Sequence, residues 1–123
     1  MTCFAKFLAA RLRSFGFALQ GLGYTLKTQG NMRVHLLAAL LMGALALGVG
    51  VSRMEGAALG AAVGLVWVAE LLNTAIETLC DYVEPARAEA IKRTKDIAAG
   101  AVLVAAAAAA LIGGLVFYPY LFA

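Results

Sequence analysis

The carboxy-terminal 27 residues, from Ile97 to Ala123, contain no Asp, Glu, Lys or Arg. A second charge-free stretch of 19 residues runs from Val34 to Ser52. A helix rises 1.5 Å per residue, so the shorter stretch would be about 28 Å long. Both stretches can therefore cross a hydrocarbon layer of roughly 30 Å. The chain is also 63% hydrophobic and 14% charged, against roughly 45–50% and about 25% in soluble domains. The sequence therefore predicts an all-α integral membrane protein.

Length and charge exclude two other classes of protein. With 123 residues, the chain is too short for an enzyme with a separate soluble nucleotide-binding domain, which alone takes about 100–200 residues. The net charge of +3 comes from basic residues that long apolar runs separate, so no basic tail or patch is predicted for nucleic acid. Anionic lipid headgroups are the expected partner of these charges.

The middle apolar stretch, Gly56 to Cys80, contains acidic and amide side chains. At about 100° per residue, Glu70, Asn73, Glu77 and Asp81 share one helix face. Glu70 lies about 16 Å of helix rise inward of Asp81. Carboxylates inside a membrane cost about 2.5–3.5 kcal/mol each and by default are functional, facing a bundle interior or a wet cavity. The alternative is that these carboxylates pair with Arg or Lys of a neighbouring helix. A row of carboxylates also suits Mg²⁺, which prefers oxygen ligands.

Lys95 and Asp96 come directly before the last span. An ammonium group can bind phosphate oxygens, although such a pair is also an ordinary helix start in which the acid favours the helix dipole. Combined with the acidic face, the pair indicates phosphoryl transfer, which depends on positioning and charge neutralisation. The sequence has no Gly-Lys dipeptide and so no P-loop. The alternative function is a small oligomeric ion channel or ion-coupled carrier.

One membrane domain, residues 1–123, is expected, with spans at about 34–52, 56–82 and 95–119. The segment at about 4–29 has apolar residues at spacings of three and four, which predicts an amphipathic helix in the membrane interface. The positive-inside rule, by which cytoplasmic segments carry more Lys and Arg, puts the amino terminus in the cytoplasm and the carboxy terminus outside. The basic residues that decide this are five before the first span and four after the second: Lys6, Arg11, Arg13, Lys27, Arg33, Arg87, Lys92, Arg93 and Lys95.

Several residues leave alternatives open. Arg11 lies at the edge of the apolar face of the amphipathic helix, where it either snorkels to the surface or serves an anionic ligand. His35 at the entrance of the first span is taken as a polar interfacial residue. Small residues repeat every four positions in the second and third spans, which favours close helix contact and self-association. Cys3 and Cys80 have no metal-ligand spacing and are expected to be free thiols.

The sequence resembles the prokaryotic diacylglycerol kinase family, which includes the undecaprenol kinases, along nearly the whole chain. Two motifs carry most of the resemblance: Ala-Glu-Leu-Leu-Asn-Thr-Ala-Ile-Glu at residues 69–77 followed by Asp81, and Lys-Asp-Ile-Ala-Ala-Gly-Ala-Val at residues 95–102. Further matches are Ser14-Phe15, Ala18, Gly21 and Asn31-Met-Arg-Val-His35. The last of these is more similar to undecaprenol kinases, which favours a polyprenol as acceptor.

The resemblance implies one surface helix and three transmembrane helices in a homotrimer of a bacterial inner membrane, with sites between subunits. It implies transfer of the γ-phosphate of MgATP, which enters from the cytoplasm, to diacylglycerol or undecaprenol. Glu70 would be the general base that acts on the lipid hydroxyl group. Asn73 would help to orient that hydroxyl group, and Glu77 would bind the Mg²⁺ of MgATP. The implied nucleotide contacts are Lys95, Asp96, Glu77, Arg13 and Phe17. Gln29 stands where the family usually has a metal-binding Glu, so weaker Mg²⁺ binding is expected.

Overall fold

The computed structural model describes residues 2–86 and 88–122. These residues form four α-helices: α1 (Cys3–Thr28), α2 (Gly30–Val49), α3 (Arg53–Val83) and α4 (Glu89–Phe122). The last three are long and apolar enough to cross a membrane. The predicted all-α fold with three such helices is therefore confirmed. Arg87, which contributed to the expected orientation, and Ala123, the end of the charge-free run, lie outside the described residues.

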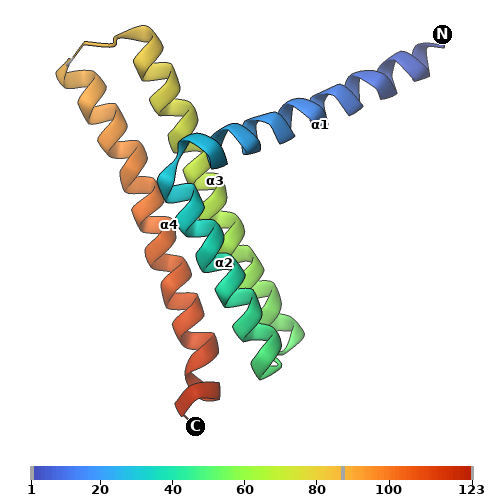
Figure 1. Cartoon of the computed structure of the whole chain (residues 1–123), viewed down its shortest axis with the longest axis vertical. Coiled ribbons are helices and arrows are strands. Elements are labelled where there is room, and N and C mark those ends of the chain that lie inside the picture. Colours follow the sequence, from blue (N-terminus) through green and yellow to red (C-terminus); the bar gives the residue numbers. More distant parts are fainter. Residues whose placement is uncertain (1, 87, 123) are drawn as a thin grey trace.

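Helices α2, α3 and α4 lie side by side, whereas α1 leaves them near the start of α2 and extends away (Figure 1). The contact between α3 and α4 is the most extensive one between elements, and α2 packs mainly on α3. Small side chains on α4, such as the buried Ala98 and Ala105, allow this approach. Helix α3 is thus the element around which the bundle is built.

Large apolar side chains cover much of the outer surface of the helices. Phe4, Leu8 and Leu12 on α1 are exposed, as are Leu40 on α2 and Leu103 on α4. A helix that is apolar on all sides suits a lipid environment or contact with further helices. The amphipathic interfacial position expected for α1 fits these exposed side chains and stays a prediction.

The observed helix ends differ from the expected boundaries where local hydrogen bonds extend or end a helix. Helix α2 begins at Gly30 instead of 34, because the single extended residue Gln29 joins it to α1. It ends at Val49 and is capped by Gly50, whose φ of 73° is the left-handed conformation that glycine adopts easily. Helix α3 then starts with a capping box, in which Ser52 N–H donates to Glu55 Oε2 at 2.7 Å and Glu55 N–H to Ser52 Oγ at 3.2 Å.

Helix α4 is longer than the expected span of 95–119 at both ends. It begins at Glu89 and continues through Pro119 to Phe122. The expected span ended at Pro119, but this proline lies within the last turn of the helix, where only three helical residues follow it. Its missing N–H removes the bond to the carbonyl four residues earlier. The hydroxyl of Tyr120 donates to Glu55 Oε2 at 2.7 Å. This bond joins the end of α4 to the start of α3.

Candidate active site

Three of the expected site residues on α3 line one polar cavity. Glu70, Asn73 and Glu77 face a cavity of about 330 Å³ between α2, α3 and α4. Each follows the previous one by three or four residues, so they lie on the same face of the helix. Helix α2 adds Asn31 and His35, and α4 adds apolar side chains between Ala99 and Ala106.

The carboxylate of Glu70 is buried without a hydrogen-bond donor among the described residues. Its side chain is 1% exposed, and neither Oε1 nor Oε2 has a partner. Thr74 lies nearby, but its hydroxyl donates to the backbone oxygen of Glu70 at 2.9 Å and not to the carboxylate. Since buried polar groups are nearly always hydrogen-bonded, these two oxygens are available to an incoming donor such as a hydroxyl group.

Asn73 and Glu77 are linked to each other beside this carboxylate. Asn73 Nδ2 donates to Glu77 Oε1 at 3.4 Å, whereas the buried Asn73 Oδ1 has no partner within the part of the chain that the structure describes. The amide is thereby held with its oxygen free. The site thus offers acceptor atoms from three successive turns of α3.

His35 is a cavity residue that the sequence interpretation placed only at the interface. Its Nε2 atom lies 4.0 Å from Glu70 Oε2, and its side chain is 20% exposed. The sequence carries one signal for this position, because Asn31 and His35 are four residues apart and therefore share a face at the start of a helix that is apolar from Leu36 onward. Nothing in α2 itself shows that this face meets Glu70.

Asp81 and Lys95 form an ion pair beside the cavity. Lys95 Nζ donates to Asp81 Oδ1 at 2.5 Å, which connects α3 to α4. Asp81 follows Glu77 by four residues and Lys95 precedes Ala99 by four, so the pair lies about 6 Å of helix rise from cavity-lining residues on both helices. Asp81 therefore lies one helical turn beyond Glu77 and does not line the cavity of Glu70.

Asp96 has a cation of its own on α4. Lys92 Nζ donates to Asp96 Oδ2 at 2.6 Å, and both side chains are exposed. An exposed pair at this spacing is an ordinary helix-surface interaction. Asp96 does not line the cavity of Glu70.

The remaining site candidates lie away from the cavity within one chain. Gln29 is the half-buried residue between α1 and α2, and its side chain caps neither helix. Arg13 and Phe17 are exposed on α1, the helix that extends away from the other three (Figure 1). None of the three lines the cavity that contains Glu70.

The donor atoms fit a magnesium ion that arrives with phosphate groups. Among residues 2–86 and 88–122, no group of three or more His, Cys, Asp and Glu side chains could hold a metal ion by itself. However, Glu77 and the free Asn73 Oδ1 supply hard oxygen ligands, which Mg²⁺ prefers and commonly combines with phosphate oxygens and water. The chain therefore suits a metal shared with a phosphate-bearing substrate.

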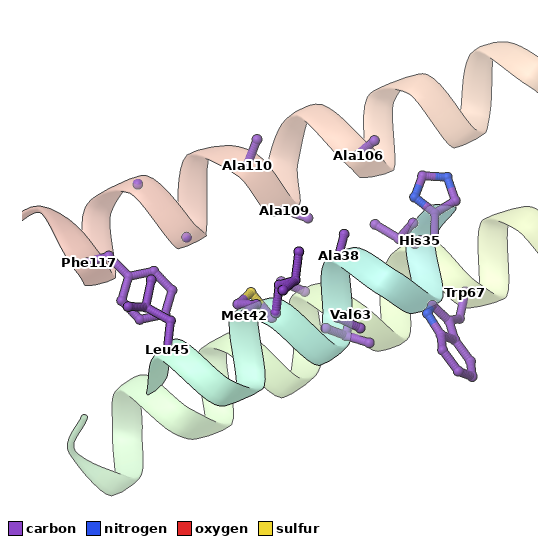
Figure 2. A pocket seen from close by; sticks show the side chains of 16 residues that line it. His35, Ala38, Met42, Leu45, Val63, Trp67, Ala106, Ala109, Ala110 and Phe117 are labelled. Atoms are coloured by element: carbon purple, nitrogen blue, oxygen red, sulfur yellow. The ribbon is translucent and has the colours of Figure 1, made fainter. Parts of the chain in front are cut away.

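An apolar groove of about 420 Å³ adjoins the polar cavity. His35 lies at one end of this groove and Phe117 and Leu45 at the other, with small alanines of α4 along one wall (Figure 2). His35 and Ala106 line both the groove and the cavity of Glu70. A molecule with an apolar tail and a polar head can therefore occupy both spaces at once.

The fold and the site together define a class: a small all-α membrane protein whose helices enclose a buried carboxylate beside an apolar groove. Residues 16–117 match the family model described as prokaryotic diacylglycerol kinase. The chain belongs to this family.

Three curated proteins are similar to the chain. It is 38% identical over 109 residues to a diacylglycerol kinase of Synechocystis, covering 88% of this chain and 62% of that protein. It is 36% identical over 109 residues to the undecaprenol kinase of Bacillus subtilis, covering 89% of each. A diacylglycerol kinase of Haemophilus influenzae is 30% identical over 108 residues, which are 87% of this chain and 92% of that protein. The chain thus spans less than two thirds of the Synechocystis relative.

Proposed function

We propose that this chain is a membrane lipid kinase that transfers the γ-phosphoryl group of MgATP to the hydroxyl group of a lipid alcohol. The observation that carries the proposal is the unpartnered Glu70 carboxylate, buried in the polar cavity near His35, which also lines the apolar groove. Membership of a kinase family favours this function over the ion channel or carrier. The named activities of the relatives make diacylglycerol and undecaprenol the two acceptors to test.

In the proposed reaction, Glu70 acts as the general base. The lipid tail occupies the groove, and the hydroxyl group donates to a free carboxylate oxygen of Glu70. As the hydroxyl oxygen attacks the γ-phosphorus, its proton passes to Glu70, and the bond from the γ-phosphorus to the leaving oxygen of ADP breaks. A positioned base of this kind contributes typically 10²–10⁴-fold to the rate. Asn73 lies beside this carboxylate and helps to orient the reacting hydroxyl group.

The nucleotide is proposed to reach the cavity through the Asp81–Lys95 end of the bundle. Lys95, which is paired with Asp81, supplies an ammonium group to phosphate oxygens, and Asp96 lies next to it. Glu77 holds the magnesium ion, which when bound neutralises phosphate charge. This end of the bundle would face the cytoplasm, with the carboxy terminus outside the inner membrane, as the distribution of basic residues favours.

A homotrimer is proposed because one chain leaves the site incomplete. Arg13, Phe17 and Gln29 do not reach the cavity of their own chain, and the surfaces of α1 and α2 expose large apolar side chains. Sites formed between subunits predict that co-assembled Glu70→Gln and Arg13→Ala chains have more activity than the two variants have separately. Activity no higher than the sum of the two variants would contradict shared sites.

The test of the proposed function is a transfer assay with the purified full chain in lipid. Protein is given γ-labelled ATP, Mg²⁺ and either diacylglycerol or undecaprenol, and label is measured in the extracted lipid. The expected result is labelled phosphatidate or undecaprenyl phosphate, absent without acceptor and strongly reduced in Glu70→Gln. No labelled lipid with either acceptor would overturn the proposal, and comparing turnover on the two lipids in one detergent tests the favoured polyprenol.

A further inference from the structure

His35 brings a polar side chain of α2 close to the buried carboxylate of α3. Its Nε2 atom is 4.0 Å from Glu70 Oε2, and it lines both the apolar groove and the polar cavity. Figure 2 shows its ring at the end of the groove, between α2 and α4. A lipid headgroup that approached Glu70 from the groove would pass this ring.

No described side chain donates a hydrogen bond to the Glu70 carboxylate. On α3, the amide of Asn73 is engaged with Glu77 and the hydroxyl of Thr74 with a backbone oxygen. The residues that α4 contributes to the cavity, from Ala99 to Ala106, have no polar side chain. Asn31 of α2 also lines the cavity, but His35 is the described residue whose ring nitrogen lies 4.0 Å from the carboxylate, and we take it as the donor that can hold Glu70.

We propose that His35 is a positioning residue that holds the Glu70 carboxylate through an Nε2–H donor, leaving the second oxygen directed at the lipid hydroxyl. This inference rests on the proposed function. A separation of 4.0 Å is longer than a hydrogen bond, but catalytic hydrogen bonds in structures without substrate are often long and shorten when the substrate binds. A small rotation of either side chain closes the gap.

The arrangement gives a physical reason for a donor at this place. A carboxylate free to rotate presents its oxygens in many directions, whereas one held at a single oxygen presents the other in a fixed direction, which lowers the cost of reaching the reactive geometry. A hydrogen bond to a charged group also offsets part of the cost of burying it. His35 would therefore affect turnover more than nucleotide binding.

A spectroscopic test is possible because the chain contains one histidine. The ¹⁵N resonance of His35 Nε2 is recorded in the full-length protein in lipid, with and without the Glu70→Gln substitution. We expect this resonance to shift in Glu70→Gln and to stay in place in Glu84→Gln, the same change at an exposed carboxylate at the end of α3. An unchanged resonance in Glu70→Gln overturns the inference without bearing on the kinase activity.

A kinetic test separates positioning from a general structural role. His35→Leu is expected to lower kcat about tenfold, the size of one hydrogen bond to a charged group, with the KM for MgATP unchanged. His35→Gln keeps an N–H donor near Nε2 and should remain within about threefold of the original kcat. Leu111→Ala, an exposed position on α4 that lines neither cavity, is the control with unchanged kcat.

The outcomes of the kinetic test are distinct. Equal losses in His35→Leu and His35→Gln, or full activity in His35→Leu, overturn the positioning role while the kinase activity stands. An original protein that phosphorylates neither lipid overturns the proposed function, and this inference with it. Retained kcat in His35→Gln together with the loss in His35→Leu supports both.

Discussion

Replacing Glu70 by Gln should separate the stability of this protein from its activity. The substitution keeps the shape of the side chain and removes the charge from a carboxylate that is 1% exposed and has no hydrogen-bond donor in the described residues. A carboxylate within a membrane helix costs about 2.5–3.5 kcal/mol, whereas a buried amide with unmet hydrogen bonds costs about 1–3 kcal/mol. The difference predicts a variant about 1 kcal/mol more stable than the original protein.

The same substitution should nearly abolish phosphoryl transfer. Loss of a positioned base is expected to reduce kcat by about 10²–10⁴-fold, or roughly 3–5 kcal/mol of transition-state stabilisation. Binding of MgATP should change little, because Lys95 and Glu77 are intact. A variant with lower activity and higher stability would identify Glu70 as a residue kept for chemistry at the expense of folding.

Two measurements check these expectations on the same preparation. Reversible unfolding by SDS in mixed micelles gives the free energy of unfolding, and the labelled-lipid assay gives kcat and the KM for MgATP. Turnover above about a tenth of the original value would show that Glu70 is not the base. A decrease in the free energy of unfolding would refute the reasoning that its carboxylate is unpaired and costly.

Three further predictions concern the Asp81–Lys95 pair, the residue between α1 and α2, and the end of α4. Lys95→Met should raise the KM for MgATP about tenfold, because it removes the ammonium group that is proposed to bind phosphate oxygens and that is paired with Asp81. An unchanged KM in steady-state assays would contradict a nucleotide role. Gln29→Glu should lower the Mg²⁺ concentration for half-maximal activity by about tenfold, or about 1.4 kcal/mol, because a carboxylate binds a hard cation better than an amide. An unchanged Mg²⁺ titration would show that position 29 is not at the metal. Tyr120→Phe removes the exposed hydrogen bond to Glu55, which water replaces, so both the unfolding midpoint and turnover should stay the same; a clear drop in either would show that this bond matters.

The fold could be predicted because the membrane restricts the choices. Apolar runs of sufficient length specify helices in a membrane, and the described chain has three helices that are long and apolar enough to cross one. The ends of the helices depend on local hydrogen bonds and were less predictable. The capping box of Ser52 and Glu55 and the left-handed Gly50 set the turn between α2 and α3, while Pro119 is tolerated inside the last turn of α4.

The site could be predicted along one helix and less well between helices. Periodicity alone places Glu70, Asn73 and Glu77 on one face, and all three line one cavity. Periodicity does not show which side chain of another helix meets that face, since this depends on the rotation of each helix about its axis. For this reason the sequence did not predict that His35 lies near Glu70. Asp81 is on the same face of α3 but is paired with Lys95 of α4.

The order of environments along the bundle explains how so small a chain could handle two substrates of opposite polarity. From the Phe117 end, the apolar groove leads to His35, then to the unpaired carboxylate of Glu70, and one helical turn beyond Glu77 to the Asp81–Lys95 pair. In the proposed reaction a lipid approaches along the groove and a nucleotide from the charged end, so the hydroxyl and the γ-phosphoryl group meet at the carboxylate. A base nearer the ion pair would be solvated and less able to exclude water as a competing acceptor, whereas a base deeper in the groove would be beyond reach of the phosphates. The position of Glu70 therefore satisfies both requirements at the energetic cost of one buried charge.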